Sequence, residues 1–154
     1  MLQEAKPLPV PGLVKLNSIS ALKLFLRDLI GLYERETDRY GDKVGRLMRM
    51  MDSEMEGKGT MKVREVEWKK RGMIMVSTEE PVRGTLELII ETMEDYKAKA
   101  KRTLEVLTYI SELEDLGIPE DAAILVYLRH GVPLRVVVDN ERKPEVDALI
   151  PALA

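Results

Sequence analysis

Seven residues between positions 58 and 71 combine positive charge with one large aromatic ring. Lysine and arginine side chains can bind phosphate groups, and an indole ring can stack on a nucleic-acid base. If this segment forms a hairpin, its basic tip could enter a groove of a duplex or follow the phosphates. The candidate nucleic-acid-binding residues are Lys58, Lys62, Arg64, Trp68, Lys69, Lys70 and Arg71.

A simpler interpretation of these residues stays open. A basic hairpin tip keeps a protein soluble whether or not it binds a ligand, and a tryptophan beside a sheet is more often core than a stacking platform. Residues 1–77 carry 15 Lys and Arg against 11 Asp and Glu, whereas residues 78–154 carry 9 against 16. Opposite charges could simply help the two halves associate, or the basic half could meet nucleic acid or another anionic partner.

Two pairs of carboxylates raise the question of a metal site. Glu91 and Glu94, followed by Glu112 and Asp115, form a Glu-x-x-Glu, spacer, Glu-x-x-Asp string. This string resembles that of all-helical nucleotide pyrophosphatases of the MazG type, which implies magnesium held by pairs on two packed helices. Residues 95–111 contain no turn signal, so one helix would hold the pairs about 30 Å apart, too far to share a metal. A metal-dependent helical hydrolase is therefore the last of three functional hypotheses.

His130 is the only histidine, and the chain contains no cysteine. A catalytic histidine needs a nucleophile or an orienting carboxylate nearby, and the adjacent sequence offers neither. Its predicted place at a helix C-terminus explains it as a partner of the negative end of the helix dipole. A zinc site within one chain normally needs more histidine or cysteine than this. We predict no catalytic residues, no metal site and no cofactor, and an enzyme is the least favoured class of function.

Two long apolar stripes indicate the elements that must position any site. Apolar residues recur in steps of three and four from Leu22 to Met55, and again from Val82 to Ile110. This spacing predicts amphipathic helices over about 19–56 and from about Pro81 to 116. The second helix could also begin one turn later. Glycine at position 41 makes a break in the first helix, or a close approach of another backbone, an open alternative.

Smaller elements are predicted around the helices. Residues 60–77 form a hairpin with a four-residue turn at 69–72, and residues 134–138 form a strand that could pair with it. For residues 122–128 we prefer a short buried helix over a strand, although periodicity does not distinguish the two. Residues 1–18 form an extended proline-rich arm, and residues 141–154 a C-terminal tail.

The predicted fold is mainly α (α+β). Two long helices form an antiparallel hairpin, and residues 60–77 and 118–140 form a small cap of a β-hairpin and a short helix. Residues 19–140 make up a single domain. The composition, 45% apolar and 33% charged, is that of a folded protein, and its many Lys, Glu and Arg residues suit heat adaptation. No apolar run reaches the roughly 18 residues needed to cross a bilayer, so we expect a cytoplasmic protein without membrane contact.

The stripes contain more apolar surface than one helical hairpin covers. A cluster near the end of the first helix is the predicted interface, and we expect it to dimerise with coiled-coil-like packing. Our first functional hypothesis is therefore a non-enzymatic oligomerisation or adaptor protein. The alternative is a nucleic-acid-binding accessory or regulatory protein that uses residues 58–71. The interface residues are Leu47, Met48, Met51 and Met55.

Overall fold

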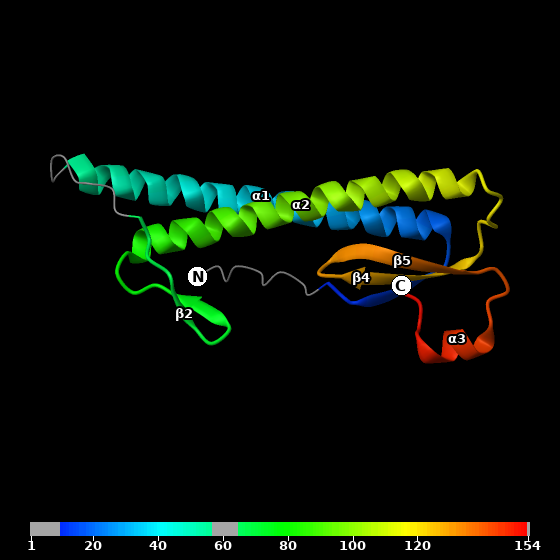
Figure 1. Cartoon of the computed structure of the whole chain (residues 1–154). Helices are drawn as coiled ribbons and strands as arrows, with labels where there is room; N and C mark the ends of the chain where they lie inside the picture. The colour runs from blue at the N-terminus through cyan, green and yellow to red at the C-terminus, as the bar shows by residue number, and fades with distance from the viewer. Residues whose placement is uncertain (1–9, 57–64, 154) are drawn as a thin grey trace, which may run out of the picture. The chain divides into compact units, whose positions relative to one another are not determined.

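Two long helices dominate the computed structural model, which describes residues 10–56 and 65–153; the side chains of residues 54–56 are outside that description. Helix α1 spans Ile19–Glu56 and helix α2 spans Pro81–Glu114. They pack against each other as an antiparallel hairpin, and the rest of the fold includes two small antiparallel sheets (Figure 1). The predicted fold class, a helix-rich α+β protein with a helical hairpin, is confirmed.

The helix ends follow the capping signals in the sequence. Ser18 Oγ accepts the backbone N–H of Ala21 at 3.0 Å, and the Ser18 carbonyl accepts that of Leu22 at 3.1 Å. These bonds satisfy amide groups that have no partner within the first turn. Pro81 is the first residue of α2, where its missing N–H costs nothing. After α2, Gly117 adopts the left-handed conformation with φ of +79°.

Helix α1 runs without a break through Gly41. A methyl group built on Gly41 would meet only the sulfur of Met93, at 3.7 Å, which is an ordinary van der Waals distance. Within the described part of the chain, no backbone therefore approaches this glycine closely. The continuous helix is the correct alternative.

The structure divides into two compact units that share both helices. One consists of Met1–Gly31 and Lys99–Ala154, and the other of Leu32–Ala98. We call them the sheet unit and the hairpin unit.

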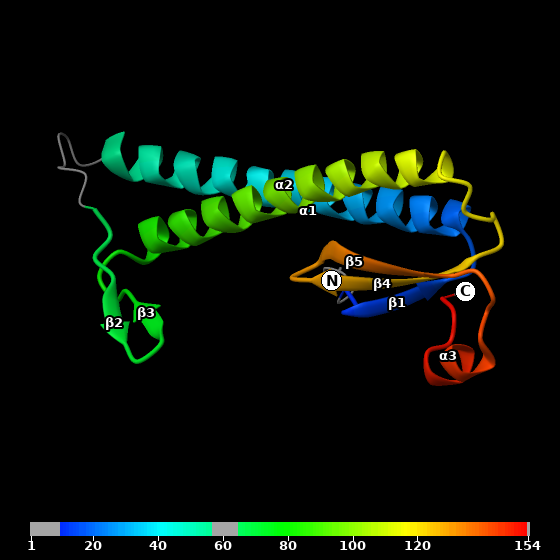
Figure 2. The same ribbon diagram turned by 45° about the vertical axis from the view of Figure 1, so that its right-hand side comes forward.

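The sheet unit contains a three-stranded antiparallel sheet with strand order β1-β4-β5. Its strands are β1 (Leu13–Leu16), β4 (Ala123–Arg129) and β5 (Val132–Asp139). The beginning of α1 and the end of α2 lie on one side of this sheet, and the short helix α3 (Pro144–Leu149) lies on the other (Figure 2). Alternate strand residues are buried, namely Val14, Leu16, Ile124, Val126 and Leu128, as expected for a face covered by helices.

Three predictions for this unit are wrong. Residues 122–128 are not a helix, because Ala123–Arg129 form the central strand, paired with β1 and β5. A strand with neighbours on both sides and apolar surface on both faces produces the continuous apolar run that resembled a buried helix. His130 lies in the β4–β5 turn with φ of +53°, not at a helix end. Residues 134–138 do form a strand, but it pairs with β4 rather than with the hairpin.

The hairpin unit contains a separate two-stranded sheet of β2 (Lys69–Arg71) and β3 (Ile74–Val76). The predicted hairpin is thus present, but its predicted turn over 69–72 is wrong. The turn consists of Gly72 and Met73, and Gly72 supplies a φ of +60°. Two-residue hairpin loops require such positive φ values, which places the glycine inside the loop and the basic residues on the strand.

The C-terminal segment, predicted as a tail over residues 141–154, contains the short helix α3. Helix α3 begins with a proline at its first turn, and beyond it the Leu153 N–H donates to the Lys15 carbonyl at 2.8 Å. This bond lies on the outer edge of β1, because the other edge of β1 pairs with β4. The chain therefore covers one edge of its own sheet.

Candidate functional site

Strand β2 holds three of the predicted nucleic-acid-binding residues. Lys69, Lys70 and Arg71 are consecutive and all exposed. The backbone pairs them with Val76, Met75 and Ile74 of β3. Lys58, Lys62 and Arg64 lie outside the described residues. Of the predicted cluster, the structure thus places this short basic strand and Trp68.

The two faces of this hairpin differ in charge. Cross-strand partners share a face, so Lys69 and Arg71 lie on one face and Lys70 on the other. Beside Lys69 and Arg71 is an open cleft of about 180 Å³ that Glu67 and Glu79 also line. Two carboxylates beside two cations balance the charge of the cleft. Lys70, on the other face, is the cation of β2 whose charge these carboxylates do not balance, so it would contribute most to binding an anionic ligand.

Trp68 is held by α2. Its indole Nε1 donates to Glu87 Oε2 at 2.7 Å, and its ring edge lies 4.0 Å from the place where a Gly84 side chain would begin. The ring is half-buried. Because Gly84 has no side chain, the ring can lie against the first turns of the helix, and Trp68 anchors the start of the hairpin. Gly84 and Glu87 were not predicted as its partners; their spacing of three residues on a predicted helix was the available signal.

The hairpin also presents apolar side chains to solvent. Met73 is fully exposed at the turn, and Ile74 and Met75 are more than half exposed on β3. A two-stranded hairpin with so little buried surface is marginally stable by itself in water. Its exposed surface is therefore mixed, with basic residues on one strand and apolar residues on the other.

The predicted interface residues lie near the C-terminal end of α1. Leu47 and Met51 are half-buried, whereas Met48 is exposed; the side chain of Met55 is outside the described residues. Met50, which is not one of the four predicted interface residues, is also more than half exposed. On the helix, Met48 and Met50 flank the inward stripe on opposite sides.

Three tyrosines form a cluster between the two helices of the hairpin unit. The ring centroids of Tyr33 and Tyr96 are 5.9 Å apart, and Tyr40 stacks on Tyr96 at 6.0 Å. Next to them, Arg39 pairs with Glu36 at 2.9 Å, and its guanidinium lies 5.2 Å from the Tyr40 ring centre. The three tyrosines lie within the two predicted apolar stripes, whereas Glu36 and Arg39 were not predicted as site residues. Their spacing of three residues was the available signal.

Burial changes the acidity of this cluster. It raises the pKa of Tyr33 to about 12, with smaller contributions from Tyr96 and Asp95. Burial also raises the pKa of Tyr96, followed by the negative charge of Glu36. Both phenols are therefore neutral near pH 7, so they can donate hydrogen bonds but do not act as nucleophiles. Aromatic and ionic pairs of this kind help to fix the register of packed helices.

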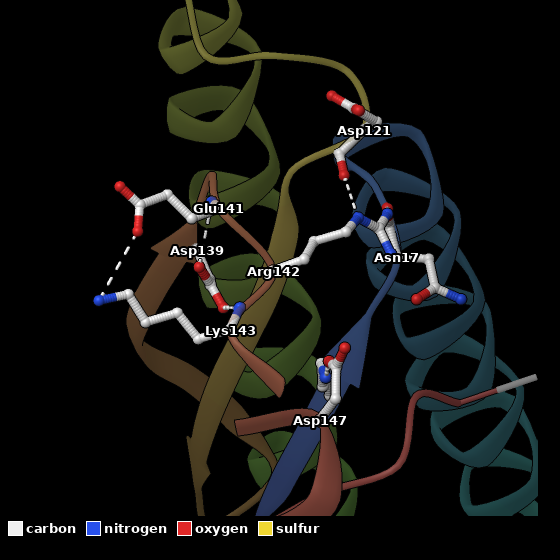
Figure 3. A network of polar contacts seen from close by, with 8 residues as sticks. Asn17, Asp121, Asp139, Glu141, Arg142, Lys143 and Asp147 are labelled. Atoms are coloured by element: carbon white, nitrogen blue, oxygen red, sulfur yellow. Dashed lines mark hydrogen bonds and ion pairs between the residues drawn. The ribbon is translucent and has the colours of Figure 1, made fainter. Parts of the chain in front are cut away.

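The sheet unit contains a polar network around Arg142, at the entrance to α3 (Figure 3). Arg142 has φ of +50°; its Nε donates to the Asp121 carbonyl and its Nη2 to the Asn17 carbonyl, both at 2.7 Å. Asp139 accepts the backbone N–H groups of Glu141 at 3.2 Å and Lys143 at 2.9 Å. These bonds tie the loop after β5 to the start of α1, which is a structural task.

Lys15 is the buried cation of this unit. It is 3% exposed and pairs with Asp147 of α3, which is 47% exposed. An open, mainly apolar cavity of about 230 Å³ lies beside this pair, lined by residues that include Leu125, Val137 and Val146. With the ammonium group already paired, the arrangement fastens α3 to the sheet.

The described residues contain no metal-binding group, because no three His, Asp or Glu side chains lie close enough together to hold an ion. Helix α2 is a single helix through residues 95–111, as predicted. Among the described helices, none has the length and apolarity needed to cross a membrane. Comparison of this chain with protein families, curated proteins and solved structures found no match.

Proposed function

We propose that the protein is a non-enzymatic oligomerisation or adaptor protein whose hairpin unit supplies the contact surface. The observation that carries this proposal is the unequal distribution of the core. Among the described residues, every buried apolar side chain except Tyr33 belongs to the sheet unit. The hairpin unit is rich in apolar residues but has almost no core of its own.

The exposed apolar residues of the hairpin unit support an association surface. They lie on the end of α1, on the β2–β3 hairpin and on α2, and comprise Met48, Met50, Met73, Ile74, Met75 and Leu88. Exposed apolar surface of this kind is typical of association sites. Most of these residues are methionines, whose flexible side chains adapt to a partner.

A second copy of the chain is the partner that this surface fits best. Two helical hairpins that pack side by side form a four-helix arrangement, in which half-buried stripes become a core. The half-buried residues Leu47 and Met51 would then join Met48 in one interface. The proposal therefore includes all three predicted interface residues whose side chains are described.

The experiment is sedimentation equilibrium on the intact chain and on two variants. Met48→Glu with Met50→Glu should weaken self-association because charges enter an apolar interface. Leu24→Glu is the control, since Leu24 is equally exposed on the same helix but belongs to the sheet unit. Equal effects of the two changes, or a monomeric parent protein at all concentrations, would contradict the proposal.

Nucleic-acid binding is the second candidate, favoured by the three consecutive exposed cations of β2. Replacing Lys69, Lys70 and Arg71 by alanine should abolish a mobility shift with duplex DNA. In single alanine variants that still bind, each lost phosphate contact should reduce the magnitude of the slope of log affinity against log salt by roughly 0.9. If the parent protein does not retard DNA at low salt, this candidate fails, and the oligomerisation proposal is unaffected.

A further inference from the structure

The two edges of the three-stranded sheet differ in whether another segment of the chain hydrogen-bonds to them. On the outer edge of β1, the Leu153 N–H donates to the Lys15 carbonyl at 2.8 Å, so the C-terminal segment covers it. On the other side of the sheet, β5 is the last strand, and no strand of the described residues pairs with its outer edge. An uncovered edge strand carries a row of unpaired backbone donors and acceptors and is a template for another strand.

Strand β5 has few of the features that protect an open edge. It is eight residues long, and its irregularity is confined to the first half, where Pro133 and the bulge near Leu134 lie. Residues 135–139 are regularly paired with β4 and contain three consecutive valines. Proline, bulges and inward-pointing charges are three of the usual devices against edge pairing, and this second half contains none of them. Its charged residues are one cation and one anion, Arg135 and Asp139.

We infer that β5 pairs with β5 of a second copy, antiparallel and centred on Val137. In this register Val137 faces its own counterpart, and Arg135 lies opposite Asp139 of the partner subunit. The symmetry repeats the same pair on the other side of the axis, so two opposite-charge pairs flank the valines. A two-fold interface requires such self-complementarity, and cross-strand pairs of opposite charge stabilise it.

The outward face of the sheet becomes continuous in this arrangement. Val137 is paired with Leu125 of β4 and shares its face, on the side away from the long helices. It is 58% exposed. Pairing at Val137 brings two such faces together, so a Leu125–Val137 row on each copy meets at the axis. Apolar burial is thereby added to the backbone hydrogen bonds of the joined sheets.

This interface is separate from the one proposed for the hairpin unit. All of its residues belong to the sheet unit, and it does not depend on the methionines of α1. A protein with two different two-fold surfaces assembles beyond a dimer, into a closed tetramer or an open chain.

The test is disulfide crosslinking with single-cysteine variants, which is clean because the chain has no cysteine. In Val137→Cys, the two Cα atoms across the axis should lie about 4.5–5.5 Å apart, within disulfide range. Leu134→Cys is the matched control, because Leu134 is also 58% exposed. Its two copies should lie roughly 20 Å apart, at about 3.4 Å per residue on either side of the axis. Mild oxidation should therefore crosslink the first variant and leave the second monomeric on a denaturing gel.

A charge reversal provides the second measurement. Arg135→Glu, added to Val137→Cys, places one carboxylate opposite each Asp139, on both sides of the axis, and should lower the rate of crosslinking about tenfold. Arg129→Glu is the control, since Arg129 is an exposed arginine on the central strand β4. Circular dichroism of each variant checks that it is folded. Equal crosslinking at positions 134 and 137, no crosslinking at 137, or no effect of Arg135→Glu would overturn the inference. Because Met48 and Met50 are unchanged, none of these results bears on the hairpin unit.

Discussion

Two leucines on α1, only two residues apart, test where the stability of the protein resides. Leu26 is 0% exposed in the core of the sheet unit, whereas Leu24 is 59% exposed. Leu26→Ala removes a buried side chain and leaves a cavity, which costs about 2–5 kcal/mol. Leu24→Ala makes the same chemical change on the same helix, and a surface substitution of this kind changes stability by about 0.5 kcal/mol or less.

The assay is urea unfolding followed by circular dichroism at fixed protein concentration. With a slope of about 2 kcal/mol per M, a loss of about 3 kcal/mol lowers the midpoint by about 1.5 M for Leu26→Ala. The midpoint of Leu24→Ala should stay within about 0.3 M of the parent value. Equal shifts for the two variants would refute the reasoning, because exposed and buried positions would then contribute alike.

Three further predictions concern single positions. Gly41→Ala should stabilise the protein by about 0.5–1 kcal/mol in urea unfolding, because α1 is continuous there and the added methyl meets only Met93 at 3.7 Å; destabilisation would indicate that something else packs on this glycine. Asp147→Asn should destabilise more than Lys15→Met in thermal unfolding, since the first leaves a buried ammonium unpaired and the second removes it; the reverse order would contradict the assigned ion pair. The pKa of Tyr33 is raised to about 12, so its unfolded form ionises first, and the parent protein should lose stability as pH rises from about 10 to 12. Stability measured over this range should fall less steeply in Tyr33→Phe, and an identical fall would contradict the raised pKa.

The long helices were predictable because their signals are local and redundant. Apolar steps of three and four residues, a serine before Ile19, a proline at the start of α2 and Gly117 after it all indicate the same boundaries. Gly41 and the exact start of the second helix were the ambiguous points. A single glycine costs about 1 kcal/mol in a helix, which the packing of a long helical hairpin readily offsets.

The sheet could not be predicted in the same way, because its pairing is long-range. The residues of β4 form an apolar run that fits a buried helix equally well until β1 and β5 are known to flank it. The partner of β5 was likewise decided by the two-residue turn of His130 and Gly131, both of which have positive φ. Nothing in the short sequence of β5 distinguishes β4 from the hairpin as its neighbour.

The candidate site was only partly accessible from sequence. The basic residues of β2 and the methionines of α1 were identified by charge and periodicity. The bond from Trp68 to Glu87 was not, because it joins residues in two elements whose relative placement the sequence does not determine. The Tyr33–Tyr96 contact was missed for the same reason, although both residues stood in the predicted stripes.

The central claim is that the hairpin unit is the association surface, and concentration-dependent hydrogen exchange tests it most directly. The intact chain is compared at dilute and concentrated conditions, and peptides are assigned to α1, α2 and the β2–β3 hairpin. We predict that amides in residues 44–53 and 69–76 become protected as concentration rises, while those of buried β4 do not change. If residues 44–53 and 69–76 exchange at the same rate under dilute and concentrated conditions, the account is contradicted.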